Sequence, residues 1–289
     1  MRIGLSMKYL YFFVLLSFGL SSCVKNNPLP VWLEINEWTL NANPTPGDPP
    51  GALTHNFSDV WVYIDGKIIG VFEVPCKIPA LVSGSCKVTL YPAFKNNGLA
   101  STKKIYPFAE PYEITMDLKE GETYSFNPTT RYYSNTQFWI EDFEEVSVKL
   151  VKDASVSTAE MTVESNGPWG NYGHITLNST ESLWVGITEP ALSLPKSGAE
   201  VYLEFDYKNT NSILTGMIEI QNGAQVDHGG FTVSRQTSDV KWKKIYIDLK
   251  DVVSNTPSGI SYKQYLRMLL DEGLSSSEVY IDNIKVVHF

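Results

Sequence analysis

Apolar and polar residues alternate with a period of two along much of this chain, which is the pattern of β-strands. The clearest case runs from Val60 to Ile69, where two runs of β-forming residues flank Asp65-Gly66. Both residues of that pair tolerate the positive φ that a two-residue hairpin turn requires. The segment therefore predicts a β-hairpin.

Shorter alternating segments surround this hairpin in the first half of the chain. They lie around Leu33 and Ile35, and at Lys87–Tyr91, Tyr112–Leu118 and Thr123–Phe126. No convincing helical pattern accompanies them. Six or seven short strands within about 100 residues are typical of a small β-sandwich, which we expect over residues 31–133.

The region from Trp139 to Phe289 predicts a second set of strands. In Val201–Tyr207 the apolar residues share one face, whereas Glu204 and Asp206 lie on the other, where we expect solvent to cover them. The other strands are expected at Val146–Val151, Leu183–Ile187, Gly216–Gln221, Phe231–Ser234, Trp242–Leu249, Tyr265–Leu270 and Val279–Val287. About eight strands fit two packed antiparallel sheets in a jelly-roll arrangement, so the expected fold class is all-β.

The N-terminal segment has the order of a secretory signal peptide. Arg2 and Lys8 supply positive charge, and the apolar run from Tyr9 to Leu20 is too short for a permanent membrane span. Ser21-Ser22 then leads into Cys23. Small residues directly before a cysteine are those of a signal-peptide cleavage site.

This cleavage region resembles the lipobox of bacterial lipoproteins. The resemblance implies that residues 1–22 are removed and that Cys23 carries the lipid and becomes the new N-terminus. Residues 23–30 are polar and end in Pro-Leu-Pro, which predicts a tether. An ordinary signal peptide that happens to contain a cysteine is the alternative.

The charge balance limits the partners of this chain. Its net charge is −9, from 23 basic and 32 acidic residues. Removal of residues 1–22 takes away two basic residues, which makes the mature chain more acidic still. Long-range attraction therefore does not favour nucleic acid or anionic phospholipid as a partner. Membrane attachment would depend on lipid at Cys23, and stable anchoring takes more than one acyl chain.

Two further cysteines, Cys76 and Cys86, lie ten positions apart. In an exported chain an even pair of cysteines predicts a disulfide. Pro79 and Gly84 lie between them and would let the segment turn back on itself. Two buried thiols are the alternative, and zinc is not expected because no histidine lies nearby.

Three short motifs of the second region resemble jelly-roll carbohydrate-binding modules. They are Asp142-Phe143-Glu144, the strand Trp242–Leu249 and the closing strand Val279–Val286, and the similarity covers roughly Trp139 to Phe289. The whole layout resembles two-domain lipoproteins of Bacteroidetes-type bacteria. In those proteins an immunoglobulin-like or transthyretin-like domain precedes the jelly roll, which implies the same order here.

The same resemblance implies a structural calcium ion. Jelly rolls of this kind often hold calcium between an acidic residue of the first strand and the aspartate of the closing strand, which correspond to Glu144 and Asp282. Carboxylate oxygens suit this hard cation. Solvated acids at a strand edge are the alternative. No cofactor is required by the resemblance.

Sugar recognition commonly uses exposed aromatic rings with a few polar side chains around them. The best candidates are Trp169 and Tyr172, which lie among glycines in Gly167–Gly173. His228 and Arg235 are candidates for polar contacts. The alternative is that the aromatic rings only fix a long loop onto the sandwich.

Catalysis receives little support from the sequence. The four histidines show no metal-binding spacing, and no Gly-x-Ser-x-Gly motif is present. A carboxylate pair for glycoside cleavage, with Glu204 and Asp206 as an example, stays open.

The sequence therefore favours a non-catalytic binding module for glycan, attached to the bacterial cell envelope at the outer membrane. A structural or adhesive envelope protein without a small-molecule ligand is the alternative, and a glycoside hydrolase ranks third. The oligomeric state is not indicated by the sequence.

Overall fold

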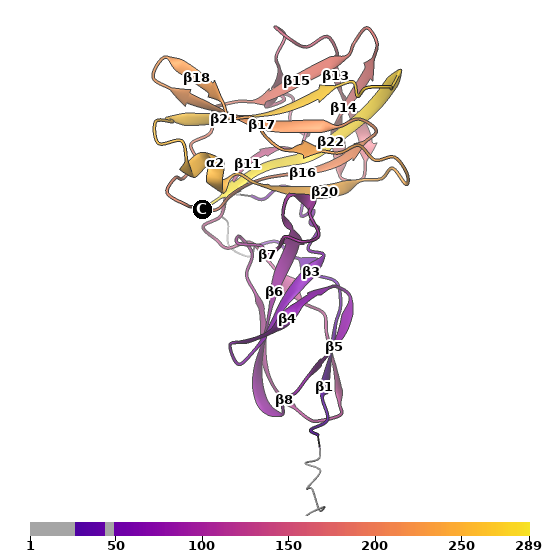
Figure 1. Ribbon diagram of the computed structural model, residues 1–289, viewed down its shortest axis with the longest axis vertical. Helices are drawn as coiled ribbons and strands as arrows, with labels where there is room; N and C mark the ends of the chain where they lie inside the picture. Colours follow the sequence, from indigo (N-terminus) through magenta and orange to yellow (C-terminus); the bar gives the residue numbers. More distant parts are fainter. Residues whose placement is uncertain (1–26, 44–48) are drawn as a thin grey trace, which may run out of the picture.

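The computed structural model describes residues 27–43 and 49–289, so the signal peptide and Cys23 lie outside the described residues. Strands account for nearly all of the regular structure, which confirms the all-β prediction. Figure 1 shows two β-sandwiches stacked along the long axis of the molecule. We refer to them as the N-terminal sandwich (β1–β10) and the C-terminal sandwich (β11–β22).

The N-terminal sandwich contains ten strands and one short 3-10 helix. Their bounds are β1 (Val31–Ile35), β2 (Thr39–Leu40), β3 (Asp59–Ile64), β4 (Lys67–Glu73), β5 (Cys76–Ala80), β6 (Gly84–Lys95), η1 (Asn96–Gly98), β7 (Lys103–Ile105), β8 (Tyr112–Leu118), β9 (Thr123–Phe126) and β10 (Thr129–Thr130).

The hairpin predicted from Val60 to Ile69 is confirmed. Strands β3 and β4 pair antiparallel, and Asp65 and Gly66 between them have φ values of 50° and 75°. The sheet β4-β3-β6-β7, with β8 beside β6, faces a smaller sheet of order β5-β1-β9. The core between them is lined by alternate residues such as Leu33, Val62 and Val88. The immunoglobulin-like or transthyretin-like identity of this sandwich stays a prediction.

The C-terminal sandwich contains twelve strands and one short α-helix. Their bounds are β11 (Gln137–Glu141), β12 (Leu150–Lys152), β13 (Met161–Gly167), β14 (Gly170–Asn178), β15 (Leu183–Thr188), β16 (Val201–Asn209), β17 (Ile213–Gln221), β18 (Ala224–Asp227), β19 (Thr232–Val233), β20 (Lys243–Asp248), α2 (Lys250–Ser254), β21 (Ser261–Leu269) and β22 (Ser276–His288).

These strands form two packed antiparallel sheets, as predicted. The first has the order β13-β14-β22-β16-β20, with β11 also beside β22, and the second has the order β12-β15-β21-β17-β18, with β19 beside β17. The inward residues of both sheets form one apolar core around Trp184, Phe205 and Met217. The jelly-roll arrangement expected for this half of the chain follows from these two sheets.

Several elements of the C-terminal sandwich differ from the prediction. The hairpin β13–β14 and the strand β11 were not predicted, and the strand expected at Val146–Val151 covers only Leu150–Lys152. Strand β13 lies at the edge of its sheet, and most of its side chains are polar and exposed. A strand with little buried apolar surface has no clear alternation, and therefore gives no sequence signal.

The predicted disulfide is wrong for this structure. Cys76 and Cys86 are both free thiols. Cys76 lies on β5, in the smaller sheet, whereas Cys86 lies on β6, in the larger one. Cys86 is buried in the apolar core and Cys76 is partly buried against it, where a free cysteine behaves as a small hydrophobic residue, so the alternative of two buried thiols holds for Cys86 and only in part for Cys76.

The two sandwiches meet on the outer face of the sheet that contains β16, β20 and β22. Aromatic residues of the N-terminal sandwich pack against this face, with ring centroids 5.5 Å apart for Phe94 and Tyr202 and 4.7 Å apart for Phe94 and Tyr246. The polar residues Glu204 and Asp206 are consequently 0% and 2% exposed. Our expectation that solvent covers them is wrong, because the N-terminal sandwich covers them instead.

Candidate functional site

The outer face of this sheet has a covered half and an open half. In the covered half a buried lysine joins the carboxylates at the interface. Lys244 Nζ lies 3.7 Å from Glu204 Oε2 and 3.8 Å from Asp206 Oδ2, and it donates a hydrogen bond to Thr54 Oγ1 at 3.1 Å. Thr54 in turn donates to Asp206 at 2.6 Å. Tyr106 of the N-terminal sandwich donates a hydrogen bond to Glu204.

Burial governs the protonation of this covered half. It raises the pKa of Glu204, although Lys244 opposes the shift. It also lowers the pKa of Lys285 to about 7, and the ammonium of this lysine donates a hydrogen bond to the carbonyl of Ala52 at 2.7 Å. Glu204 and Asp206 were our example of a hydrolytic carboxylate pair. Both side chains are almost completely buried beneath the N-terminal sandwich, so the geometry does not support that role.

The open half carries a cluster of four aromatic rings, which we call the aromatic cluster. Trp242 lies at its centre: its ring centroid is 5.6 Å from Trp169, 5.8 Å from Tyr172 and 6.4 Å from Tyr280. Trp169 is 40% exposed, and the other three rings are half-buried. Rings that are packed edge to face and remain accessible form a stiff surface on which a flat apolar ligand face can stack.

Local structure places each of these rings. Pro168 and Trp169 form the two-residue turn between β13 and β14, so the indole lies at the hairpin tip. Tyr172 follows on β14, on the face opposite the buried Ile175 and Leu177. Tyr280 stands on β22 between the buried Val279 and Ile281, and therefore points to the outer face.

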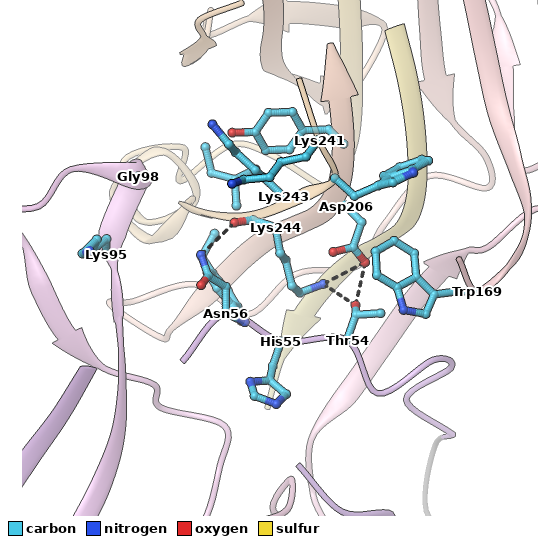
Figure 2. Close-up of a pocket in the computed structure, with 14 residues that line it drawn as sticks. Thr54, His55, Asn56, Lys95, Gly98, Trp169, Asp206, Lys241, Lys243 and Lys244 are labelled. Carbon is cyan, nitrogen blue, oxygen red and sulfur yellow. Dashed lines mark hydrogen bonds and ion pairs between the residues drawn. The ribbon is translucent and has the colours of Figure 1, made fainter. Parts of the chain in front are cut away.

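A groove of about 630 Å³ leads from the aromatic cluster to the junction of the two sandwiches. Trp169 and Trp242 line it on one side, and the loop of Thr54, His55 and Asn56 lines it on the other. Figure 2 shows Lys244 directed at Thr54 and Asp206, with Trp169 beside them. Volumes of this size are typical of small-molecule sites.

His174 ties two glutamates together next to the aromatic cluster. Its ring stacks on Tyr280, with centroids 4.4 Å apart. Its two nitrogens contact Glu164 and Glu278. Burial lowers the pKa of His174, but hydrogen bonds to the two carboxylates outweigh it and leave the pKa above its usual value.

The structure brings together only two of the four predicted ligand residues. Trp169 and Tyr172 both contact Trp242 in the aromatic cluster. His228 instead contacts Glu219 of β17, at 2.8 Å, and Arg235 lies 3.8 Å from Asp271. Neither residue lines the groove.

The sequence alone placed Trp242 at the start of a strand and did not single out Trp242, Tyr280 or Lys208 as ligand-binding residues. Lys208 Nζ lies 3.9 Å from the ring centroid of Tyr280 and 6.0 Å from that of Trp242. The alternation in Val279–Ile281 and in β16 already places Tyr280 and Lys208 on polar strand faces. Their proximity, however, depends on the pairing of β16 with β22.

The predicted calcium ligands do not form an evident metal site. The carboxylate of Glu144 accepts hydrogen bonds from the backbone and side-chain amides of Asn171. Asp282 is buried, and burial raises its pKa to about 7; its Oδ2 has no hydrogen-bond partner within the described part of the chain. Over residues 27–43 and 49–289 no group of three His, Cys, Asp or Glu side chains is arranged to hold a metal ion. Calcium therefore stays a prediction.

No family model matches the chain, and no curated protein matches it. Solved structures do, over about half of its length. One is a family 11 carbohydrate-binding module of a cellulosomal cellulase of Clostridium thermocellum, with 16% identity, a TM-score of 0.38, and coverage of 53% of this chain and 95% of the module. Another is the xylan-binding domain of Paenibacillus barcinonensis Xyn10C, with 14% identity, a TM-score of 0.36, and coverage of 52% and 99%.

A third match is the enzymatically active domain of a tailspike protein of bacteriophage CBA120. Its identity is 11% and its TM-score is 0.36, and the match spans 53% of this chain but only 19% of the tailspike chain. Similarities at this level describe a strand arrangement and identify no ligand or reaction. Fold and site together define an all-β protein whose jelly-roll sandwich carries an open aromatic cluster.

Proposed function

We propose that this chain is a non-catalytic glycan-binding protein of the bacterial envelope. The C-terminal sandwich binds the glycan, and lipid at Cys23 anchors the chain to the outer membrane. The observation that supports glycan binding is the aromatic cluster around Trp242, which stays accessible while Glu204 and Asp206 on the same sheet face are buried. Pyranose rings have apolar faces that stack on such rings.

The shape of the molecule suits this arrangement. Figure 1 shows β1 toward the end of the N-terminal sandwich that lies far from the C-terminal sandwich. A lipid at Cys23, eight residues before Val31, would attach the molecule at that far end. The N-terminal sandwich would then act as a stalk that holds the aromatic cluster away from the membrane. No helix of residues 27–43 or 49–289 is long and apolar enough to cross a bilayer.

Binding is tested with the mature protein and a panel of neutral and acidic polysaccharides, by affinity electrophoresis and calorimetry. We expect Trp242→Ala to weaken binding about tenfold, because the loss of one stacked aromatic ring costs roughly 1.4 kcal/mol. Trp32→Ala is the control, since Trp32 is also an accessible tryptophan, 36% exposed, but lies on β1 of the stalk.

Binding to no polysaccharide, or equal binding by the Trp242→Ala variant, would overturn the glycan proposal. A structural or adhesive envelope protein would then be favoured, and cross-linking in the native membrane would identify its partners. Metabolic labelling with palmitate tests the anchor separately. We expect the label on the wild type and none on Cys23→Ser.

A further inference from the structure

The aromatic cluster is surrounded by lysines, although the chain as a whole is acidic. Lys95, Lys241, Lys243 and Lys244 line the groove, and Lys208 stands between Tyr280 and Trp242. The net charge of the chain is −9. A local excess of positive charge in an acidic protein points to the charge of what binds there.

Most of these lysines already have a carboxylate partner. Lys95 pairs with Glu73 at 3.0 Å, and Lys241 pairs with Asp239 at 2.5 Å. The buried Lys244 lies between Glu204 and Asp206. For Lys208 and Lys243, no carboxylate of residues 27–43 and 49–289 lies within ion-pair distance.

Of Lys208 and Lys243, it is Lys208 that lies within the aromatic cluster. It is half-buried, and its ammonium lies 3.9 Å from the ring centroid of Tyr280. His174, Tyr280 and Lys208 are register partners on β14, β22 and β16, so their side chains form one row across the sheet. Trp242 extends this row toward the edge strand β20. Strand spacing makes the row about 14 Å long, enough for more than one sugar ring.

The carboxylates of Glu164 and Glu278, near this row, already have hydrogen-bond partners. Glu164 accepts a hydrogen bond from Tyr172 at 2.8 Å and also contacts His174. Glu278 accepts a hydrogen bond from Thr176 at 3.0 Å and contacts the other nitrogen of His174. The hydrogen bond from His174 lowers the pKa of Glu164, and Lys208 contributes in the same direction.

We infer that the site takes an anionic polysaccharide, a uronate or sulfated glycan, and that Lys208 binds the charged group while Trp242 and Tyr280 stack on the sugar rings. This inference depends on the proposed function. A neutral glycan would offer the ammonium only hydroxyl groups, whereas a carboxylate or sulfate forms a charge-assisted hydrogen bond that is roughly twice as strong. Lys241 and Lys243 on the groove wall add to the attraction at longer range.

The test compares polymers that differ only in charge. Polygalacturonate, alginate and hyaluronan are each measured beside their carboxyl-reduced forms, with dextran sulfate beside dextran, and with neutral xylan and mixed-linkage glucan. We expect at least one charged polymer to bind about tenfold more tightly than its neutral form, with an affinity that falls as salt rises.

Substitutions of Lys208 test whether this residue causes the preference for charged polymers. We expect Lys208→Met to lose most of the preference for the charged polymer and Lys208→Arg to retain it. Lys119→Met is the control, because Lys119 is an exposed lysine in the turn between β8 and β9, in the other sandwich. It should bind as the wild type does.

The outcomes separate the two proposals. Neutral polymers that bind as well as charged ones through Trp242, or a Lys208→Met variant with an unchanged preference, would overturn the anionic ligand and leave glycan binding intact. Binding to none of the polymers would overturn both. Charged polymers that bind equally well to Trp242→Ala would indicate ion exchange at the surface and contradict both.

Discussion

The covered and open halves of one sheet face use the same strands and the same alternation for different purposes. Glu204, Asp206 and Lys244 lie in the covered half, where the N-terminal sandwich excludes water. Lys208 and Tyr280 lie on β16 and β22 of the same sheet, where both are half-buried and stay partly accessible. A polar strand face is therefore structural or ligand-binding according to what is docked on it.

The difference between the halves is a difference in how charge is compensated. In the covered half Lys244 has carboxylate partners within 4 Å, which offset the cost of burying its charge. In the open half solvent compensates Lys208, and a ligand can replace that solvent. Four tests with substituted proteins probe this contrast.

Removal of the buried ammonium has the largest expected effect. Lys244→Met leaves Glu204 and Asp206 buried together without the lysine that lies within 4 Å of both, so we expect the free energy of unfolding to fall by about 3 kcal/mol. Lys208→Met in the open half should cost less than about 1 kcal/mol. Urea unfolding measures both. Equal losses of unfolding free energy in Lys244→Met and Lys208→Met would contradict the difference between the two halves.

Lys285→Met should stabilise the protein at neutral pH and below. The pKa of Lys285 is lowered to about 7 by burial, so the folded state disfavours the charged form that the unfolded chain keeps up to about pH 10. Wild-type stability from this group is therefore lowest below pH 7 and rises between pH 7 and pH 10. The gain from the variant, on the order of 2 kcal/mol, should shrink over the same range.

Unfolding curves of both proteins at pH 6, 7.5 and 9 check this expectation. A gain that is the same at every pH would mean that Lys285 does not titrate with folding.

Trp242→Ala and Tyr246→Phe alter aromatic residues on or beside the same strand in the two halves. Trp242→Ala should weaken polysaccharide binding by about tenfold. Tyr246→Phe removes the hydroxyl that accepts a hydrogen bond from the backbone amide of Asn56 at 2.7 Å, so it should cost about 1 kcal/mol of stability and weaken binding much less than Trp242→Ala does. A Tyr246→Phe variant that lost as much affinity for polysaccharide as Trp242→Ala would contradict this division between the two halves.

The smallest effect is expected at His174. Hydrogen bonds to Glu164 and Glu278 raise its pKa in the folded state despite burial, so its stabilising effect is full below about pH 6.5 and is lost as the pH rises through the raised pKa. His174→Gln should remove this pH dependence, with a change of less than about 1 kcal/mol because the site is partly solvated. Thermal unfolding between pH 5 and 8 measures it; identical profiles for wild type and variant would contradict the expectation.

The candidate site was only partly predictable. Trp169 and Tyr172 lie in a glycine-rich segment, which marks them locally as exposed rings. Trp242 and Lys208 stand 34 positions apart and meet only because β16 and β20 pair. His228 and Arg235 have suitable chemistry for a site, but their neighbours are Glu219 and Asp271, outside the groove. No local sequence pattern shows that Trp242 and Lys208 belong to the site whereas His228 and Arg235 do not.

Alternation in the sequence was enough to predict strands such as β3, β4 and β16 and the direction of their side chains, because a period of two is a local property of the backbone. The turn at Asp65-Gly66 is equally local, since it depends on the φ values that these two residues tolerate. The packing of the N-terminal sandwich determines which part of the outer sheet face is buried. That depends on contacts between residues far apart in the chain, such as Thr54 and Asp206, 152 positions apart. Burial of a charge is a property of everything packed around it, and no window of sequence contains that information.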